Sequence, residues 1–204
     1  SSPPSNEPIA DNVSLSHSGL LRCPHRSRYN CTMVPTVQWH DGAVRLLDQS
    51  RLPETVDFVD CRDVASVALA IRELKVRGAP AIGVTAAMGV ALGAQSITAS
   101  EYESFAKELL SICDYLASTR PTAVNLFWAI DRMKKKMASL RDEPIVSIKA
   151  ALWKESQAIL EEDIALCKAM GRHGAELIKK GQTVLTHCNA GALATAGYGT
   201  ALGG

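Results

Sequence analysis

A cysteine near the end of the chain stands where its thiol could be reactive. Cys188 lies between His187 and Asn189, and an apolar run that is expected to form a strand at 183–187 leads into it. A strand that ends at a glycine-rich turn places side chains where α/β enzymes bind ligands. There a cysteine can have a lowered pKa or act as a proton donor. The alternative is an inert, buried small hydrophobe, and the spacing alone leaves both open.

Two arginines stand in patterns that suit phosphate binding. Arg77 begins an Arg-Gly-Ala-Pro sequence, and Arg120 begins an Arg-Pro-Thr sequence. Because proline is favoured at the first position of a helix, each arginine is expected just outside a helix N-terminus. Free backbone N–H groups would then face the same space as the guanidinium, and Gly78 and Ala79 would let a ligand approach the backbone closely. The alternative for each arginine is a helix cap or a salt bridge.

The elements that must position these residues follow a recognisable order. Asp41-Gly42 between two apolar runs predicts a β-hairpin, and the spacing of apolar residues predicts a helix that begins near Arg62 or Asp63. Further helices are expected at 81–94, 101–117, 122–139 and about 145–179. In the last of these, Gly171 and Gly174 are candidate interruptions.

The chain is accordingly divided into three parts. Residues 1–32 are rich in Ser and Pro and are interpreted as a disordered extension, with a targeting segment as the alternative. Residues 33–180 are expected to form a mainly helical N-terminal domain with a β-hairpin. Residues 181–204 are expected to hold the first strand of a truncated Rossmann-like domain, so that the fold class is α/β.

Composition excludes several classes of partner. Of 204 residues, 47% are hydrophobic and 5% aromatic, and the net charge is +1, so neither nucleic acid nor an anionic membrane is expected. The stretch from Gly78 to Ser100 carries no charge, but its many small residues favour a helix packed inside a protein over a membrane span. The six cysteines never form Cys-x-x-Cys, which favours reduced thiols in the cytosol and no zinc site.

Five blocks of sequence together resemble the methylthioribose-1-phosphate isomerases of methionine salvage. The resemblance runs from about Val37 to Gly204. The blocks, in the order found in that family, are Trp39-His40-Asp41-Gly42, Leu46-Leu47-Asp48-Gln49, Val76-Arg77-Gly78-Ala79-Pro80-Ala81-Ile82-Gly83, Arg120-Pro121-Thr122-Ala123-Val124-Asn125-Leu126 and Thr186-His187-Cys188-Asn189-Ala190-Gly191-Ala192-Leu193-Ala194-Thr195.

The resemblance implies an aldose-to-ketose isomerase in the cytoplasm, with the nucleus as a further location. Its substrate would be 5-methylthioribose 1-phosphate, its product 5-methylthioribulose 1-phosphate, and it would use neither metal nor organic cofactor and act as a homodimer. By the same resemblance Cys188 is the catalytic cysteine. The residues expected to bind the substrate and its phosphate are Arg77, Gly78, Ala79, Arg120 and Asn189.

The resemblance also implies that the family's catalytic Asp and an Asn-Lys pair lie beyond Gly204. The 204 residues alone are therefore expected to have no isomerase activity, as an N-terminal fragment would. Three alternatives stay open. They are a ribose-1,5-bisphosphate isomerase, a non-catalytic regulatory subunit of the exchange factor for translation initiation, and a chain that acts only as a partner of full-length subunits.

Overall fold

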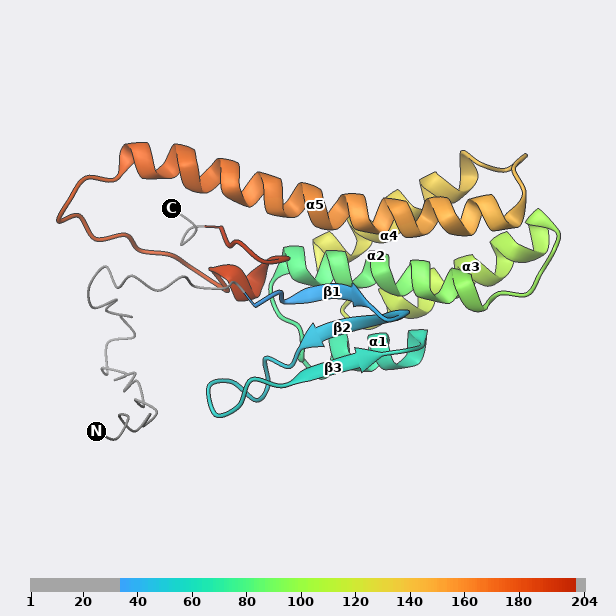
Figure 1. Ribbon diagram of the computed structural model, residues 1–204, viewed down its shortest axis with the longest axis horizontal. Coiled ribbons are helices and arrows are strands. Elements are labelled where there is room, and N and C mark those ends of the chain that lie inside the picture. The colour runs from blue at the N-terminus through green and yellow to red at the C-terminus, as the bar shows by residue number, and fades with distance from the viewer. Residues whose placement is uncertain (1–33, 201–204) are drawn as a thin grey trace, which may run out of the picture. The chain divides into compact units, whose positions relative to one another are not determined.

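A computed structural model describes residues 34–200, and the predicted extension at 1–32 lies outside them. Three antiparallel strands form one sheet in the order β1 (Val37–His40), β2 (Ala43–Leu47) and β3 (Phe58–Cys61) (Figure 1). The predicted hairpin is confirmed, since His40 pairs with Ala43. Asp41 and Gly42 both have positive φ, 48° and 72°, as the favoured two-residue hairpin turn requires. The third strand was not predicted.

Five α-helices follow the sheet in the described part of the chain, and the predicted ones are all present. They are α1 (Val64–Arg72), α2 (Ala79–Ser96), α3 (Tyr102–Ala117), α4 (Val124–Ala138) and α5 (Ile145–Leu177). Asp63 caps α1, where its carboxylate accepts the Ser66 N–H at 2.7 Å. Helix α5 runs through Gly171 and Gly174 without the expected interruption. The observed architecture is therefore α/β, with one small antiparallel sheet and a larger helical layer.

Helix α2 is the centre of this layer. All fourteen of its residues from Ala81 to Ala94 are buried, and it contacts each of the other four helices. Small residues permit this close packing, because a Cβ on Gly89 would come within 2.9 Å of Val67 and one on Gly93 within 2.7 Å of Val64. Its length and apolar composition would suit a membrane span, yet 78% of it is buried inside the protein. The expectation of a core helix is confirmed.

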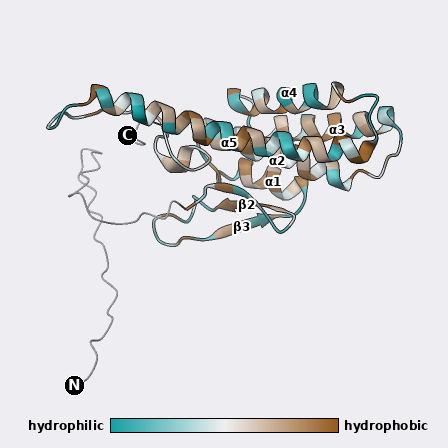
Figure 2. Ribbon diagram, turned by 45° about the horizontal axis from the view of Figure 1, so that its top comes forward, coloured by the Kyte–Doolittle hydropathy of each residue, from teal (hydrophilic) through white to brown (hydrophobic). Residues whose placement is uncertain are grey.

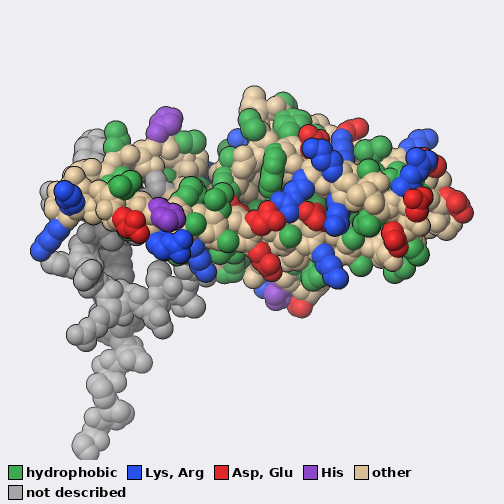
Figure 3. All heavy atoms as spheres, turned by 90° about the horizontal axis from the view of Figure 1, so that it is seen from above, with side chains coloured by type: hydrophobic (Ala, Val, Ile, Leu, Met, Phe, Trp, Pro, Cys, Tyr) green, Lys and Arg blue, Asp and Glu red, His purple; other side chains and the backbone are tan. Residues whose placement is uncertain are grey.

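Helices α4 and α5 are joined by ion pairs on their outer faces. Arg132 of α4 makes two hydrogen bonds to Glu162 of α5, at 2.5 and 2.7 Å, and donates to Glu155 at 2.7 Å. The Arg132 guanidinium also lies 5.6 Å from the centre of the Trp128 ring. Figure 3 shows one face of the protein, on which acidic and basic side chains are interspersed. Along the ribbon of α5, hydrophilic and hydrophobic residues alternate (Figure 2).

The strand predicted at 183–187 is not formed within residues 34–200. These residues have no regular secondary structure and pair with no strand in the described part of the chain, and Leu185 is 91% exposed. The physical reason is that a strand exists through hydrogen bonds to a neighbour, which an apolar run cannot supply by itself. After α5 the chain runs back toward the start of α2 and makes a short 3₁₀ turn at Ala192–Ala194 (Figure 1).

Candidate functional site

Gly78 brings two of the sequence blocks into direct contact. A Cβ at this position would lie 2.4 Å from both the Cα and the carbonyl oxygen of Ala194, so only glycine fits. Gly78 also has φ +91°, which disfavours any side chain. It is the residue before helix α2, so the Arg77–Ala79 corner lies against the segment that follows Cys188.

The turn after Cys188 is also held from the N-terminal sheet region. The Thr36 hydroxyl donates to the Ala192 carbonyl at 3.1 Å, and the Gln49 side-chain amide donates to the Leu193 carbonyl at 2.8 Å. Both Thr36 and Gln49 are buried. Their hydrogen bonds satisfy carbonyls of an irregular segment and fix it beside the start of α2.

Helix α5 holds the other side of the same turn. One Asp163 carboxylate oxygen accepts the Ala196 N–H at 2.7 Å. Burial raises the pKa of the Asp163 carboxyl, and this backbone hydrogen bond partly offsets the rise. Within the turn, the Thr195 hydroxyl accepts the N–H groups of Gly197 and Gly199 at 3.3 and 3.0 Å.

Arg120 does not lie directly before a helix, although the sequence predicted that it would. Helix α4 begins at Val124, so Pro121 lies three residues before it and is not its first residue. A turn closed by the Ala123 N–H and the Arg120 carbonyl at 3.0 Å occupies the gap. In the Arg77 block the proline lies almost where it was predicted, because Pro80 is the second residue of α2. Gly78 and Ala79 therefore stand at a helix N-terminus as expected, whereas Arg120 is separated from one by the turn.

The block that begins at Arg120 nevertheless lies against the block that contains Arg77. A Cβ on Gly83 of α2 would come within 2.9 Å of the Asn125 carbonyl oxygen of α4. Arg77 is exposed and donates its Nε to the Leu74 carbonyl at 3.2 Å, while Arg120 is half-buried. Neither arginine belongs to any ion pair found among residues 34–200.

Cys188 is the exposed member of the four cysteines that lie in the described residues. Its φ is +67°, so the chain turns sharply at the thiol. His187 and Asn189 are exposed on either side of it. Burial raises the pKa of the Cys61 and Cys167 thiols, and that of Cys113 to about 12. Among these four, Cys188 carries the accessible thiol.

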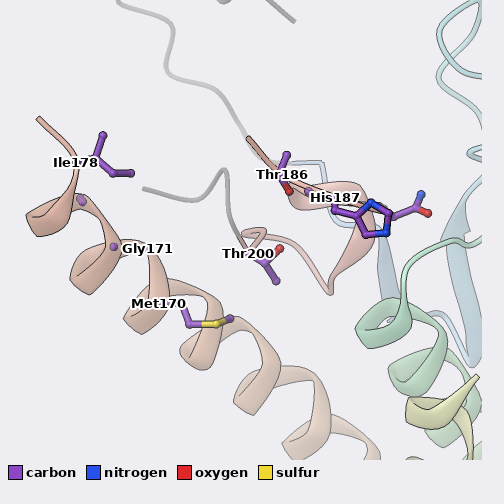
Figure 4. Close-up of a pocket in the computed structure, with 10 residues that line it drawn as sticks. Met170, Gly171, Ile178, Thr186, His187 and Thr200 are labelled. Carbon is purple, nitrogen blue, oxygen red and sulfur yellow. The ribbon is translucent and has the colours of Figure 1, made fainter. Parts of the chain in front are cut away.

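A cavity of about 430 Å³ opens between α5 and the segment that carries Cys188. Thr186 and His187 line it from that segment, opposite Met170 and Gly171 of α5, and Thr200 lies between them (Figure 4). Asn189 lines it as well. Cys188, Arg77 and Arg120 are not among the residues that line this cavity.

A second cavity of about 400 Å³ lies among α2, α4 and α5. It shares Met170 and Thr200 with the first, so the two adjoin. Its lining joins the two arginine blocks, at Pro80 and Asn125 respectively. The other lining residues are Gly83, Val84, Val124, Trp128, Ile159, Glu162, Asp163, Leu166 and Cys167.

Two acidic residues of this second cavity, Glu162 and Asp163, were not predicted from the sequence. In the sequence they resemble charges on the outer face of a long amphipathic helix. The signal that separates Asp163 from its neighbours is its contact with Ala196, which only the fold provides.

The sequence of this chain matches a known family. A family model described as "Initiation factor 2 subunit family" matches residues 75–201. The chain belongs to this family. The matched region contains the Arg77 and Arg120 blocks and the Cys188 turn, which comprises residues 188–199.

Members of this family with curated names include methylthioribose-1-phosphate isomerases. Those of Trichlorobacter lovleyi and Geobacter sulfurreducens are each 58% identical to this chain over 168 residues, which are 82% of this chain and 49% of the relative. The chain thus spans about half the length of the curated relatives it matches.

Two solved structures of the family resemble the fold. One is 5-methylthioribose 1-phosphate isomerase from Pyrococcus horikoshii OT3, with a TM-score of 0.76 and 39% identity over 83% of this chain and 48% of that one. The other is translation initiation factor eIF-2B, subunit delta, from A. fulgidus, with a TM-score of 0.73 and 42% identity over 83% of this chain and 49% of that one.

Proposed function

We propose that the whole protein isomerises 5-methylthioribose 1-phosphate to 5-methylthioribulose 1-phosphate. The observation that carries the proposal is the contact of Gly78 with Ala194, because it brings the proposed phosphate corner against the segment that follows the exposed Cys188. The curated names of relatives at 58% identity support the same substrate.

The phosphate is assigned to the corner at the start of α2. The N–H groups at a helix N-terminus and the positive end of its dipole favour an anion, and Gly78 and Ala79 present backbone there. Arg77 and Arg120 supply the guanidinium donors, consistent with the absence of either from the ion pairs among residues 34–200. Asn189 is assigned to the sugar.

The chemistry assigned to Cys188 is proton transfer. In the overall reaction the bond from C1 to the ring oxygen breaks, and that oxygen gains a proton. C2 and its hydroxyl each lose a hydrogen, and C1 gains one, so substrate and product are isomers and no external oxidant is needed. A thiol at a sharp turn, accessible and free of other bonds, can exchange protons with the sugar in this sequence.

The remaining assignments concern the whole protein. We propose that residues 183–187 form the first strand of a Rossmann-like parallel sheet, and that the helical part at 33–180 is a separate domain. We also propose a cytoplasmic homodimer that binds no nucleic acid and needs no metal or cofactor. The 91% exposure of Leu185 supports this proposal, because the strands of a parallel sheet are apolar and are covered on both faces.

A regulatory subunit of the translation initiation factor is the second candidate function. It is favoured by the similarity to eIF-2B subunit delta, whose TM-score and identity are close to those of the isomerase. A subunit that acts through protein contacts has no need of an exposed thiol in a segment that packs against a helix N-terminus, so we favour the isomerase.

An assay of the purified whole gene product separates the candidates. Proton NMR would follow 5-methylthioribose 1-phosphate and, in parallel, ribose 1,5-bisphosphate. We expect ketose product from the first sugar, with kcat/KM above about 10⁴ M⁻¹s⁻¹, a usual value for enzymes. Faster turnover of the bisphosphate would assign the rival isomerase. No turnover of either sugar would favour the regulatory subunit.

A further inference from the structure

Asp163 occupies an unusual place for a carboxylate. It lies on α5, half-buried, and lines the second cavity. Among residues 34–200 it joins no ion pair, and the hydrogen bond it accepts there is the one from the Ala196 N–H at 2.7 Å. Partial burial of a carboxylate without a cation costs free energy. The hydrogen bond from the Ala196 N–H offsets part of this cost.

The next turn of α5 lines the same cavity. Cys167 lies four residues after Asp163 and therefore on the same face of the helix. Its thiol is buried, and it lines the second cavity together with Asp163. This face of α5 is therefore packed away from solvent beside the point where Asp163 holds Ala196.

Residues 195–199 connect to both parts of the proposed site, the Cys188 thiol and the Arg77–Ala79 corner. A Cβ on Gly199 would lie 2.7 Å from the carbonyl carbon of Gly191, which stands three residues after Cys188. Between them, Ala194 lies against Gly78. A shift of segment 195–199 would therefore displace the thiol relative to the phosphate corner.

We propose that Asp163 is a positioning residue that fixes the Cys188 turn against the Arg77–Ala79 corner through the Ala196 amide. The inference rests on the proposed function for its catalytic consequence, but the structural link does not depend on any activity. Asp163 acts through the backbone and is not assigned contact with the sugar.

The test uses the whole protein with Asp163→Ala, which removes the acceptor, and Asp163→Asn, which keeps a carbonyl oxygen for the Ala196 N–H. Glu161→Ala is the matched control, because Glu161 is an exposed acid two residues earlier on α5. Hydrogen exchange of the peptide that spans 192–199 and the rate of Cys188 alkylation are measured first. Kinetics with 5-methylthioribose 1-phosphate follow.

In Asp163→Ala we expect faster exchange at Ala196 and a change of at least about threefold in Cys188 alkylation. We expect kcat to fall about 10- to 100-fold with KM within about threefold, because small misplacements of reacting groups cost about this much. Asp163→Asn should restore most of each value, and Glu161→Ala should match the wild type.

Unchanged exchange and alkylation in Asp163→Ala would overturn the proposal, as would Asp163→Asn being as impaired as Asp163→Ala. Because exchange and alkylation need no substrate, they test the structural link even if the wild type turns over neither sugar. That last result would count against the proposed function alone.

Discussion

At the scale of single residues, the site depends on two positions with left-handed backbone. Gly78, at φ +91°, leaves room for the Ala194 backbone, and Cys188, at φ +67°, turns the chain where the thiol is exposed. The sequence identified both residues through their neighbours, as an Arg-Gly-Ala-Pro corner and a cysteine before a glycine-rich turn. It could not show that Gly78 contacts Ala194, in the segment after Cys188, because this contact is long-range.

Substitution Gly78→Ala should detach the turn from α2. The backbone conformation alone costs a residue with a side chain about 1–2 kcal/mol, and the new methyl would overlap the Ala194 backbone at 2.4 Å. We expect a loss of at least about 2 kcal/mol in the free energy of unfolding, measured by urea denaturation.

The control for this substitution is Gly174→Ala. Gly174 lies within α5, and a Cβ there would meet nothing within 4 Å. Alanine is favoured over glycine in a helix by about 1 kcal/mol, so this variant should be neutral or more stable. Equal stability changes in the two variants would show that the Ala194 contact is unimportant.

The four described cysteines should differ widely in reactivity. Burial raises the pKa of Cys61, Cys167 and Cys113, the last to about 12, whereas Cys188 is exposed. Since the thiolate is the reactive form, iodoacetamide at pH 8 should alkylate Cys188 at least about tenfold faster than Cys113. Peptide mass spectrometry against time gives the rates. Equal labelling of the two in the native protein would contradict the burial of Cys113.

At the scale of elements, local patterns predicted what local forces build. The Asp41-Gly42 turn predicted the hairpin, and the start of α1 was predicted near Arg62 or Asp63, where Asp63 caps it. The third strand, Phe58–Cys61, was missed because its short sequence has no clear alternation and its strand character comes from pairing with β2. The run 183–187 was predicted as a strand for the opposite reason, since it has the composition but no partner in the described residues.

The pairing of α4 with α5 should depend on pH. Arg132 lowers the pKa of the Glu162 carboxyl by hydrogen bonding, so the folded pKa lies below the unfolded value of about 4.5. The stabilisation is fully present above pH 4.5 and is lost as the pH falls through the folded pKa. Because Glu162 is largely exposed, its pair with Arg132 should contribute only about 0.5–1 kcal/mol at pH 7, and Arg132→Met removes the bond to Glu155 as well.

Urea denaturation of Arg132→Met and wild type at pH 7 and pH 3 tests this. The difference in unfolding free energy should shrink at the lower pH. Arg141→Met, which removes the more exposed pair with Glu103, is the matched control and should change stability less at pH 7. A difference for Arg132→Met that grows at pH 3 would show that the pair does not act through Glu162.

At the scale of the whole molecule, the fold brings together blocks that are far apart in sequence. Helix α2 provides the common support, with its first residues at the Ala194 turn and Gly83 against Asn125 of α4. Sequence blocks alone pointed to the family, which the match over residues 75–201 confirms. The contact of α5 with the Cys188 turn could not be predicted, because it depends on a hydrogen bond between Asp163 and the Ala196 amide, which are far apart in the sequence.

The Cys188 turn and the Arg77–Ala79 corner are proposed to form one site for isomerising a sugar phosphate. The decisive experiment is the rate at which the whole protein converts 5-methylthioribose 1-phosphate, compared between wild type and Cys188→Ser. We expect conversion by the wild type and a loss of about 10²–10⁴-fold in kcat for the variant, the range expected when a proton-transfer group is removed. Conversion by Cys188→Ser at the wild-type rate, or none by a folded wild type, would contradict the proposal.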